Sequence, residues 1–167
     1  MDETGHTFRA RLNTTWARSG HPPVLQRRSR RREVSSILAV TPTGQTTARH
    51  VWGTIHGPDV IRALRHFRRV LRCALLIVWD RANTHTDGRV QAFVAAHQTD
   101  FATWLLPPYA PELNPEEQAN AIIKRRMANA LPDSVAELHA WACRGVRYLQ
   151  RHPVLVQHFF DHAGLPC

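Results

Sequence analysis

The segment Pro107–Glu117 constrains the fold of this chain more than any other segment does. Its first half contains three prolines, which fix backbone angles and remove amide donors, so we expect an extended connection without helix. Asn114 and Pro115 then provide an N-cap and a first helical residue, and two glutamates follow in the first turn. The sequence therefore predicts a stiff loop that leads into a helix, which runs to about Leu131, where Pro132 stops it.

Local patterns predict the other elements of one mixed α/β domain. The run Cys73–Trp79 is continuously apolar, which is typical of a strand buried on both faces of a sheet. The first residues of the chain have no such pattern and are interpreted as a loop. We expect strands at 34–40, 46–55, 73–79 and 101–106, the first two joined as a hairpin, and helices at 58–71, 89–97, 134–151 and 154–162.

The charge of the chain favours a polyanionic partner. Its 167 residues include 22 Lys+Arg against 13 Asp+Glu, a formal net charge of +9, and arginine binds phosphate groups in a bidentate manner. An arginine-rich proteome from a GC-rich genome is the alternative origin of this bias. A solvated charged face explains the basic residues of helix 58–71 equally well. The predicted DNA-binding residues are Arg27, Arg28, Arg30, Arg31 and Arg32.

Cysteine usage and hydropathy predict the compartment. The three cysteines have no short C-x-x-C spacing, so we expect neither a disulfide framework nor a structural zinc site. No apolar run approaches the roughly 20 residues of a membrane-spanning helix, and no signal peptide opens the chain. The prediction is a soluble protein of a reducing cytoplasm that does not act at a membrane.

Asp80 is the first candidate for a functional residue. It ends the apolar run, and ligands of open α/β sheets gather outside the carboxyl ends of strands. Asn83 and His85 follow on a loop of polar residues. The alternative is that Asp80 only caps the turn after its strand, as aspartate often does.

Glu117 is the second candidate, and its structural alternative is stronger. Asn114 and Glu117 stand at the N-cap and third helical position, which is the spacing of a capping box, and carboxylates in a first turn complement the helix dipole. The proline-rich loop before them favours a functional role, because a stiff backbone holds a carboxylate in fixed geometry.

Three segments together resemble one known family. Leu105–Lys124 is similar to the "LPPYSPxLNPIE" signature of DDE transposases of the mariner superfamily and its bacterial insertion-sequence relatives. Val78–His85 resembles the family's "DNAxxH" pattern, and Asp2-Glu3 with Trp16 and Gly20–Pro23 resembles its "DE" pair and "G-x-x-P" element. The signature's final glutamate falls on Glu117, 37 positions after Asp80, in keeping with the family's spacing.

The resemblance implies a fold, a chemistry and a site. The fold is an RNase H-like (retroviral-integrase-type) mixed sheet flanked by helices. The implied activity is metal-dependent nicking of DNA 3′ ends followed by strand transfer, with two divalent ions, Mg²⁺ or Mn²⁺, and no small-molecule cofactor. The implied catalytic and metal-binding residues are Asp2, Asp80 and Glu117, and the implied secondary residues are Glu3, Asn83 and His85.

The resemblance also implies partners and has departures. It implies binding to transposon ends and target DNA, action as a homodimer, and a bacterial, cytoplasmic protein that is associated with the nucleoid when bound to DNA. The family's usual "DN", "IE" and following aromatic residue are replaced by Arg81, Glu116 and Asn120. Trp104 and Tyr109 would stack on a flipped base, although core packing is the favoured interpretation of both.

Only Met1 precedes Asp2, which leads to two further expectations. Residues 1–167 are interpreted as a single, N-terminally truncated catalytic domain that lacks the first central strand of the fold, and the family's helix-turn-helix DNA-binding region is absent. A fragment, a start codon assigned too late and a decayed element are the three explanations of this start. Two alternatives stay open: a catalytically inactive DNA-binding remnant, and an RNase H-like nuclease without strand transfer.

Overall fold

A computed structural model of the protein describes residues 1–8, 13–24, 33–108 and 110–165. The predicted arginine cluster, Arg27–Arg32, and Tyr109 lie outside these residues. The elements follow the order β1 (Asp2–Thr7), β2 (Glu33–Val40), β3 (Thr46–Trp52), α1 (Gly57–Leu71), β4 (Leu75–Trp79), α2 (Gly88–Ala96), β5 (Phe101–Leu105), a 3-10 helix (Pro111–Leu113), α3 (Pro115–Arg126), α4 (Val135–Gln150) and α5 (Pro153–His162).

The strands form two sheets, which lie next to one another where β1 begins and β4 ends. β1, β2 and β3 make an antiparallel sheet in that order, whereas β4 and β5 pair in parallel. The amino group of Met1 donates a hydrogen bond of 2.8 Å to the carbonyl of Val78, which brings the beginning of β1 beside the end of β4. The expected α/β class is confirmed, with antiparallel and parallel strand pairs present.

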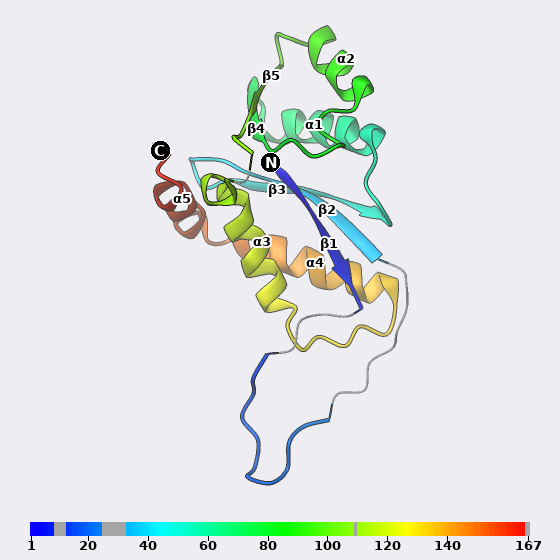
Figure 1. Ribbon diagram of the computed structural model, residues 1–167, viewed down its shortest axis with the longest axis vertical. Coiled ribbons are helices and arrows are strands. Elements are labelled where there is room, and N and C mark those ends of the chain that lie inside the picture. The colour runs from blue at the N-terminus through cyan, green and yellow to red at the C-terminus, as the bar shows by residue number, and fades with distance from the viewer. Residues whose placement is uncertain (9–12, 25–32, 109, 166–167) are drawn as a thin grey trace.

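Helices cover both faces of the antiparallel sheet (Figure 1). α1 packs on one face, and α3, α4 and α5 lie on the other. Side chains of β2 point alternately to the two faces of the sheet. Ile37 and Ala39 belong to the hydrophobic core under α1, and Val34 and Leu38 belong to the core under α3 to α5. β2 is therefore a central strand that is buried on both sides.

The expectation that the first central strand is missing is wrong. β1 spans Asp2–Thr7 and pairs along its whole length with β2, from Asp2 opposite Leu38 to Thr7 opposite Glu33. Its composition, Asp-Glu-Thr-Gly-His-Thr, hid it, because the side chains that it buries are polar. Thr4 and His6 alternate inward, so the period of two was present without apolar residues to mark it.

β4 and β5 are less buried than predicted. The prediction that residues 73–79 form a strand buried on both faces is wrong, since Leu76 is 65% exposed and the strand begins at Leu75. On β5, Trp104 is 67% exposed, so the favoured interpretation of this side chain as core packing is also wrong. α1 and α2 lie on one side of this parallel pair (Figure 1), and residues 75–78 of β4 line a pocket together with residues of α3 and α5.

The proline-rich connection and the helix after it follow the prediction with two corrections. The connection contains a 3-10 turn at Pro111–Leu113, where a helix-free path was expected. α3 begins at Pro115 as predicted, but it ends at Arg126 and not near Leu131. Asn129 adopts a left-handed backbone with φ of 60°, which turns the chain before Pro132 is reached.

Three polar side chains, one on each antiparallel strand, form a row of hydrogen bonds on the face of the sheet that α3 and α4 cover. Nε2 of His6 lies 2.8 Å from Oγ of Ser36, which lies 2.7 Å from Nδ1 of His50. Burial lowers the pKa of His6 and of His50 to about 4, and the two imidazoles are therefore neutral at pH 7. In the described part of the chain, no helix is both long and apolar enough to cross a membrane.

Candidate active site

The structure brings Asp2 and Asp80, which are 78 positions apart in the sequence, close together. Asp2 opens β1 and Asp80 directly follows β4, next to the hydrogen bond that joins Met1 to Val78. Burial raises the pKa of Asp2, and the negative charge of Asp80 raises it further. Two carboxylates that repel one another in a half-buried site favour a positive group beside them, and the buried amino group of Met1 interacts with both.

Each oxygen of Asp2 accepts a hydrogen bond. Oδ1 accepts from the backbone amide of Glu3 at 2.7 Å, and Oδ2 accepts from Nδ2 of Asn114 at 3.2 Å. Asn114 is also the N-cap of α3, where its Oδ1 accepts from the amide of Glu116. The residue that starts α3 therefore also orients the carboxylate at the start of β1.

The buried side chain of His85 orients Asp80 through a hydrogen bond to one of its carboxylate oxygens. Nδ1 of His85 lies 2.8 Å from Oδ1 of Asp80, which also accepts from the amide of Ala82 at 3.0 Å. The His85 side chain is fully buried and stacks on Trp79, with ring centroids 4.6 Å apart and planes at 13°. The Asp80 side chain is 50% exposed, so its free oxygen faces solvent while the other is held.

Glu3 approaches the second nitrogen of the same histidine. Oε1 of Glu3 lies 3.3 Å from Nε2 of His85, and Oε2 accepts from Oγ1 of Thr84 at 2.9 Å. Burial by itself lowers the pKa of His85, but the carboxylates of Glu3 and then of Asp80 outweigh it, and the pKa is raised overall. His85 and Glu3, both predicted as secondary residues, thus contact the site. Asn83 is exposed, and its backbone carbonyl accepts from Thr86.

The first turn of α3 offers two glutamates on different faces. Glu116 is fully buried; burial raises its pKa well above the usual range, and the neighbouring Asp2 carboxyl raises it further. Its Oε2 accepts from Nδ2 of Asn120 at 2.7 Å, and its carboxyl shares a hydrogen bond with the Asp2 side chain. Glu117 is exposed and lines a surface hollow with Asn13, Ala121, Lys124, Arg125 and Ala128.

Among the predicted acids, the structure therefore joins Asp2 to Asp80 and places Glu117 on the outer face of α3. Glu116, which the sequence reasoning did not assign to the site, is the α3 carboxyl that interacts with Asp2. A signal for it was present, because Glu116 stands where the resembling signature has an isoleucine, an apolar residue suited to an inward-facing position. Asn114 was predicted only as a helix cap, and its contact with Asp2 spans 112 positions.

Comparisons with known proteins confirm the expected RNase H-like fold. The profile of a family described as DDE superfamily endonuclease matches residues 1–139. Among solved structures, the chain is similar to a pre-cleavage Mos1 transpososome (TM-score 0.67, 14% identity, covering 96% of this chain and 53% of that one). It is also similar to the Mos1 mariner paired end complex with Mn (TM-score 0.66, 15% identity, covering 96% and 52%).

A viral complex shares the fold more distantly. A chain of the simian T-cell lymphotropic virus intasome in complex with PP2A regulatory subunit B56 gamma matches with TM-score 0.51 and 17% identity, over 66% of this chain and 41% of that one. No curated protein matches the chain by sequence. The chain spans about half the length of the Mos1 chains that it matches.

Proposed function

The chain belongs to the DDE superfamily endonuclease family, and we propose on this premise that it is the catalytic domain of a DNA transposase. The proposed reaction is nicking at transposon 3′ ends followed by strand transfer into target DNA. The observation that carries the proposal is the meeting of Asp2 and Asp80, which are 78 positions apart, beside the start of α3. Phosphodiester cleavage with two metal ions needs several carboxylates in one site, and here they come from separate segments of the chain.

The residues present fit a hard divalent ion. Asp2 and Asp80 repel one another in a half-buried site, and a cation would relieve this repulsion. Oxygen ligands are those that Mg²⁺ and Mn²⁺ prefer. Asp2, Asp80 and a glutamate of α3 would hold the metal, and we propose two ions, as the resemblance implies.

The protein's own residues position the reacting groups. When bound, the ions would activate a water molecule and stabilise the leaving 3′ oxygen. His85 holds one oxygen of Asp80 and leaves the other toward solvent, and Asn114 holds Asp2. In the proposed reaction water attacks the phosphorus at the transposon end and displaces the 3′ oxygen, which is released as a free 3′ hydroxyl. This hydroxyl then attacks a phosphorus of target DNA and displaces the 3′ oxygen of the target strand, and no covalent enzyme intermediate is formed.

The third acid is proposed to be Glu117, because it matches the final glutamate of the family signature. The contact between Glu116 and Asp2 makes Glu116 the alternative. The two side chains have the same chemistry and stand next to one another on α3, so they provide a matched pair for mutagenesis.

The central test is nicking of supercoiled plasmid DNA in Mn²⁺ by the unchanged chain and by Asp80→Asn. We expect the nicking to be lost in the variant, because the amide removes the charge that holds a cation while it keeps the shape of the side chain. Circular dichroism shows whether the variant is folded. Equal nicking by both proteins would reject the assignment of Asp80.

The same assay separates the glutamates. If Glu117 completes the site, Glu117→Gln abolishes nicking and Glu116→Gln retains it, since a glutamine at 116 can still accept the hydrogen bond from Asn120. The opposite result assigns the role to Glu116. Full activity in both variants would show that α3 supplies no catalytic acid.

DNA partners and assembly follow from the same proposal. We propose that the chain acts on transposon ends and target DNA as a homodimer in the bacterial cytoplasm. Joining of 3′-labelled DNA ends to a plasmid distinguishes a transposase from a nuclease that only cuts. DNA binding without nicking by the unchanged chain would instead support the inactive remnant.

A further inference from the structure

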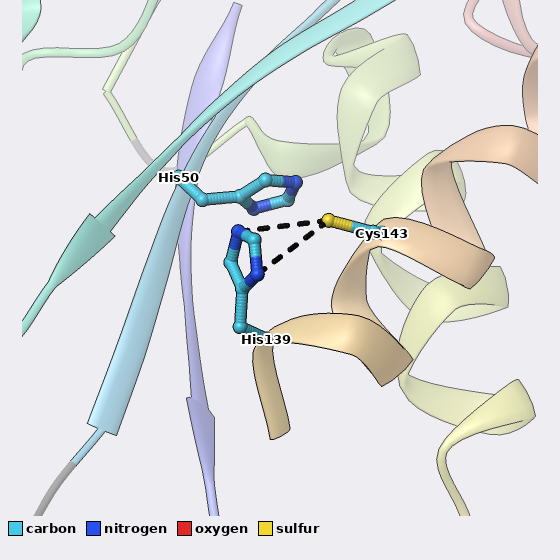
Figure 2. Close-up of side chains that lie close together, drawn as sticks. All are labelled: His50, His139 and Cys143. Atoms are coloured by element: carbon cyan, nitrogen blue, oxygen red, sulfur yellow. Dashed lines mark hydrogen bonds between the residues drawn. The ribbon is translucent and has the colours of Figure 1, made fainter. Parts of the chain in front are cut away.

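A second group of metal-ligating side chains lies away from the acidic site formed by Asp2, Asp80 and the start of α3, although the spacing of the cysteines predicted no structural zinc site. It consists of His50 on β3 and of His139 and Cys143 on α4, and all three are half-buried. One ligand atom from each lies within 4.8 Å of the others. Figure 2 shows the two imidazoles and the thiol converging in the space between the strand and the helix.

The spacing of the two α4 residues is that of a metal site on a helix. His139 and Cys143 stand four positions apart and therefore on one helical face, as paired ligands of zinc often do. Sγ of Cys143 lies 3.6 Å from Nε2 of His139. Zinc bonds of about 2.0 Å to nitrogen and about 2.3 Å to sulfur at tetrahedral angles separate two such atoms by roughly 3.5 Å.

His50 is held in place from behind. Its Nδ1 makes a 2.7 Å hydrogen bond with Oγ of Ser36, which in turn contacts Nε2 of His6. This partner fixes the orientation of the ring and leaves Nε2 of His50 as the free ligand atom. A ligating histidine in metalloproteins is usually fixed in this manner by a hydrogen bond to its other nitrogen.

We propose that His50, His139 and Cys143 form a binding site for Zn²⁺ or a similar borderline-soft divalent cation. Two imidazoles and a thiolate are three of the four ligands that a tetrahedral zinc ion takes, and water would complete the set because the cluster is only half-buried. Binding forms a metal–sulfur bond and releases the thiol proton of Cys143 to solvent. The ion would cross-link α4 to β3, which are far apart in the sequence.

The ligand chemistry separates this site from the acidic one. Asp2, Asp80 and the α3 glutamates offer oxygen alone, which suits Mg²⁺ and Mn²⁺, whereas nitrogen and sulfur ligands select zinc and cobalt. The proposal is therefore independent of the proposed transposase activity. A thiol hydrogen-bonded to His139 without any metal function is the competing explanation of the contact.

Co²⁺ titration of the purified, reduced protein tests the site, because cobalt replaces zinc and is coloured. We expect a thiolate-to-cobalt charge-transfer band that saturates at one equivalent and that Zn²⁺ displaces. Cys143→Ser should lose the band, and Ser36→Ala should weaken Co²⁺ binding by about 10- to 100-fold, since it removes the partner of His50. Cys73→Ser is the matched control, because Cys73 is an exposed free thiol, and it should keep the band.

A second measurement needs no variant. Zn²⁺ should slow alkylation of Cys143 in the unchanged chain while Cys73 reacts at the same rate, as followed by mass spectrometry of the peptides. The proposal is overturned if no charge-transfer band forms, if the band survives Cys143→Ser or disappears in Cys73→Ser, or if Zn²⁺ leaves the alkylation of Cys143 unchanged.

Discussion

The side chain of His6 is almost fully buried, and the fold disfavours its protonation. It is 2% exposed, and its hydrogen bond to Ser36 ties β1 to β2. Burial, with smaller contributions from the nearby His50 and Lys124, lowers its pKa from 6.5 to about 4. The fold therefore binds the neutral imidazole and disfavours the imidazolium.

This residue predicts acid sensitivity of the metal-free protein. Between pH 6.5 and pH 4 the unfolded chain binds a proton at His6 and the folded chain does not, so the free energy of unfolding falls as the pH falls through this window. The loss attributable to His6 is at most about 3 kcal/mol. Urea unfolding in EDTA at several pH values measures it, and the decline should be shallower in His6→Gln. An equal slope in both proteins would contradict the prediction.

The packing of α3 against α4 depends on one small residue. Gly145 lies on α4, and a Cβ added there would be 2.8 Å from Cγ2 of Ile123, a fully buried residue of α3. The missing side chain allows the two helices to approach closely.

We expect Gly145→Ala to lower the free energy of unfolding by about 1 to 2 kcal/mol, because overpacking of about 1 to 3 kcal/mol outweighs the gain in helix propensity. Gly88→Ala is the control. Gly88 begins α2, and an added Cβ there meets nothing within 4 Å, so this change should be neutral or mildly stabilising. Denaturant midpoints of the two variants measure the difference, and equal stability would show that α3 and α4 adjust freely.

Elements with strong local signals were predicted well, and those without them were not. The hairpin of β2 and β3, the amphipathic α1 and the capped start of α3 each depend on residues within a few positions of one another. β1 was missed because its inward side chains are polar and only pairing with β2 makes it a strand. The end of α3 was misplaced because a left-handed Asn129 turns the chain before the proline.

The carboxylates of the acidic site come from three separate elements: β1, the end of β4 and the start of α3. A cation bound there should stabilise the fold against unfolding, because the unfolded chain does not hold these carboxylates together. Mg²⁺ at ten times its dissociation constant should raise the free energy of unfolding by roughly 1.4 kcal/mol. Thermal unfolding with and without Mg²⁺ measures this effect, and Asp80→Asn should remove it. A Mg²⁺ effect that persists in the variant would place the ion elsewhere.

The sequence by itself determined which residues have the chemistry and which local structures carry them. Asp80 after an apolar run, and Asn114-Pro115 before two glutamates, were evident because strand ends and helix caps are short-range features. Only the tertiary structure decided which of these groups meet. Asp2 reaches Asp80 through the pairing of β1 with β2 and its contact with β4, Glu116 turns inward while Glu117 turns outward, and His50 meets His139 and Cys143 across a strand and a helix. Such meetings depend on side-chain burial and on contacts between distant segments, which spacing along the chain does not encode.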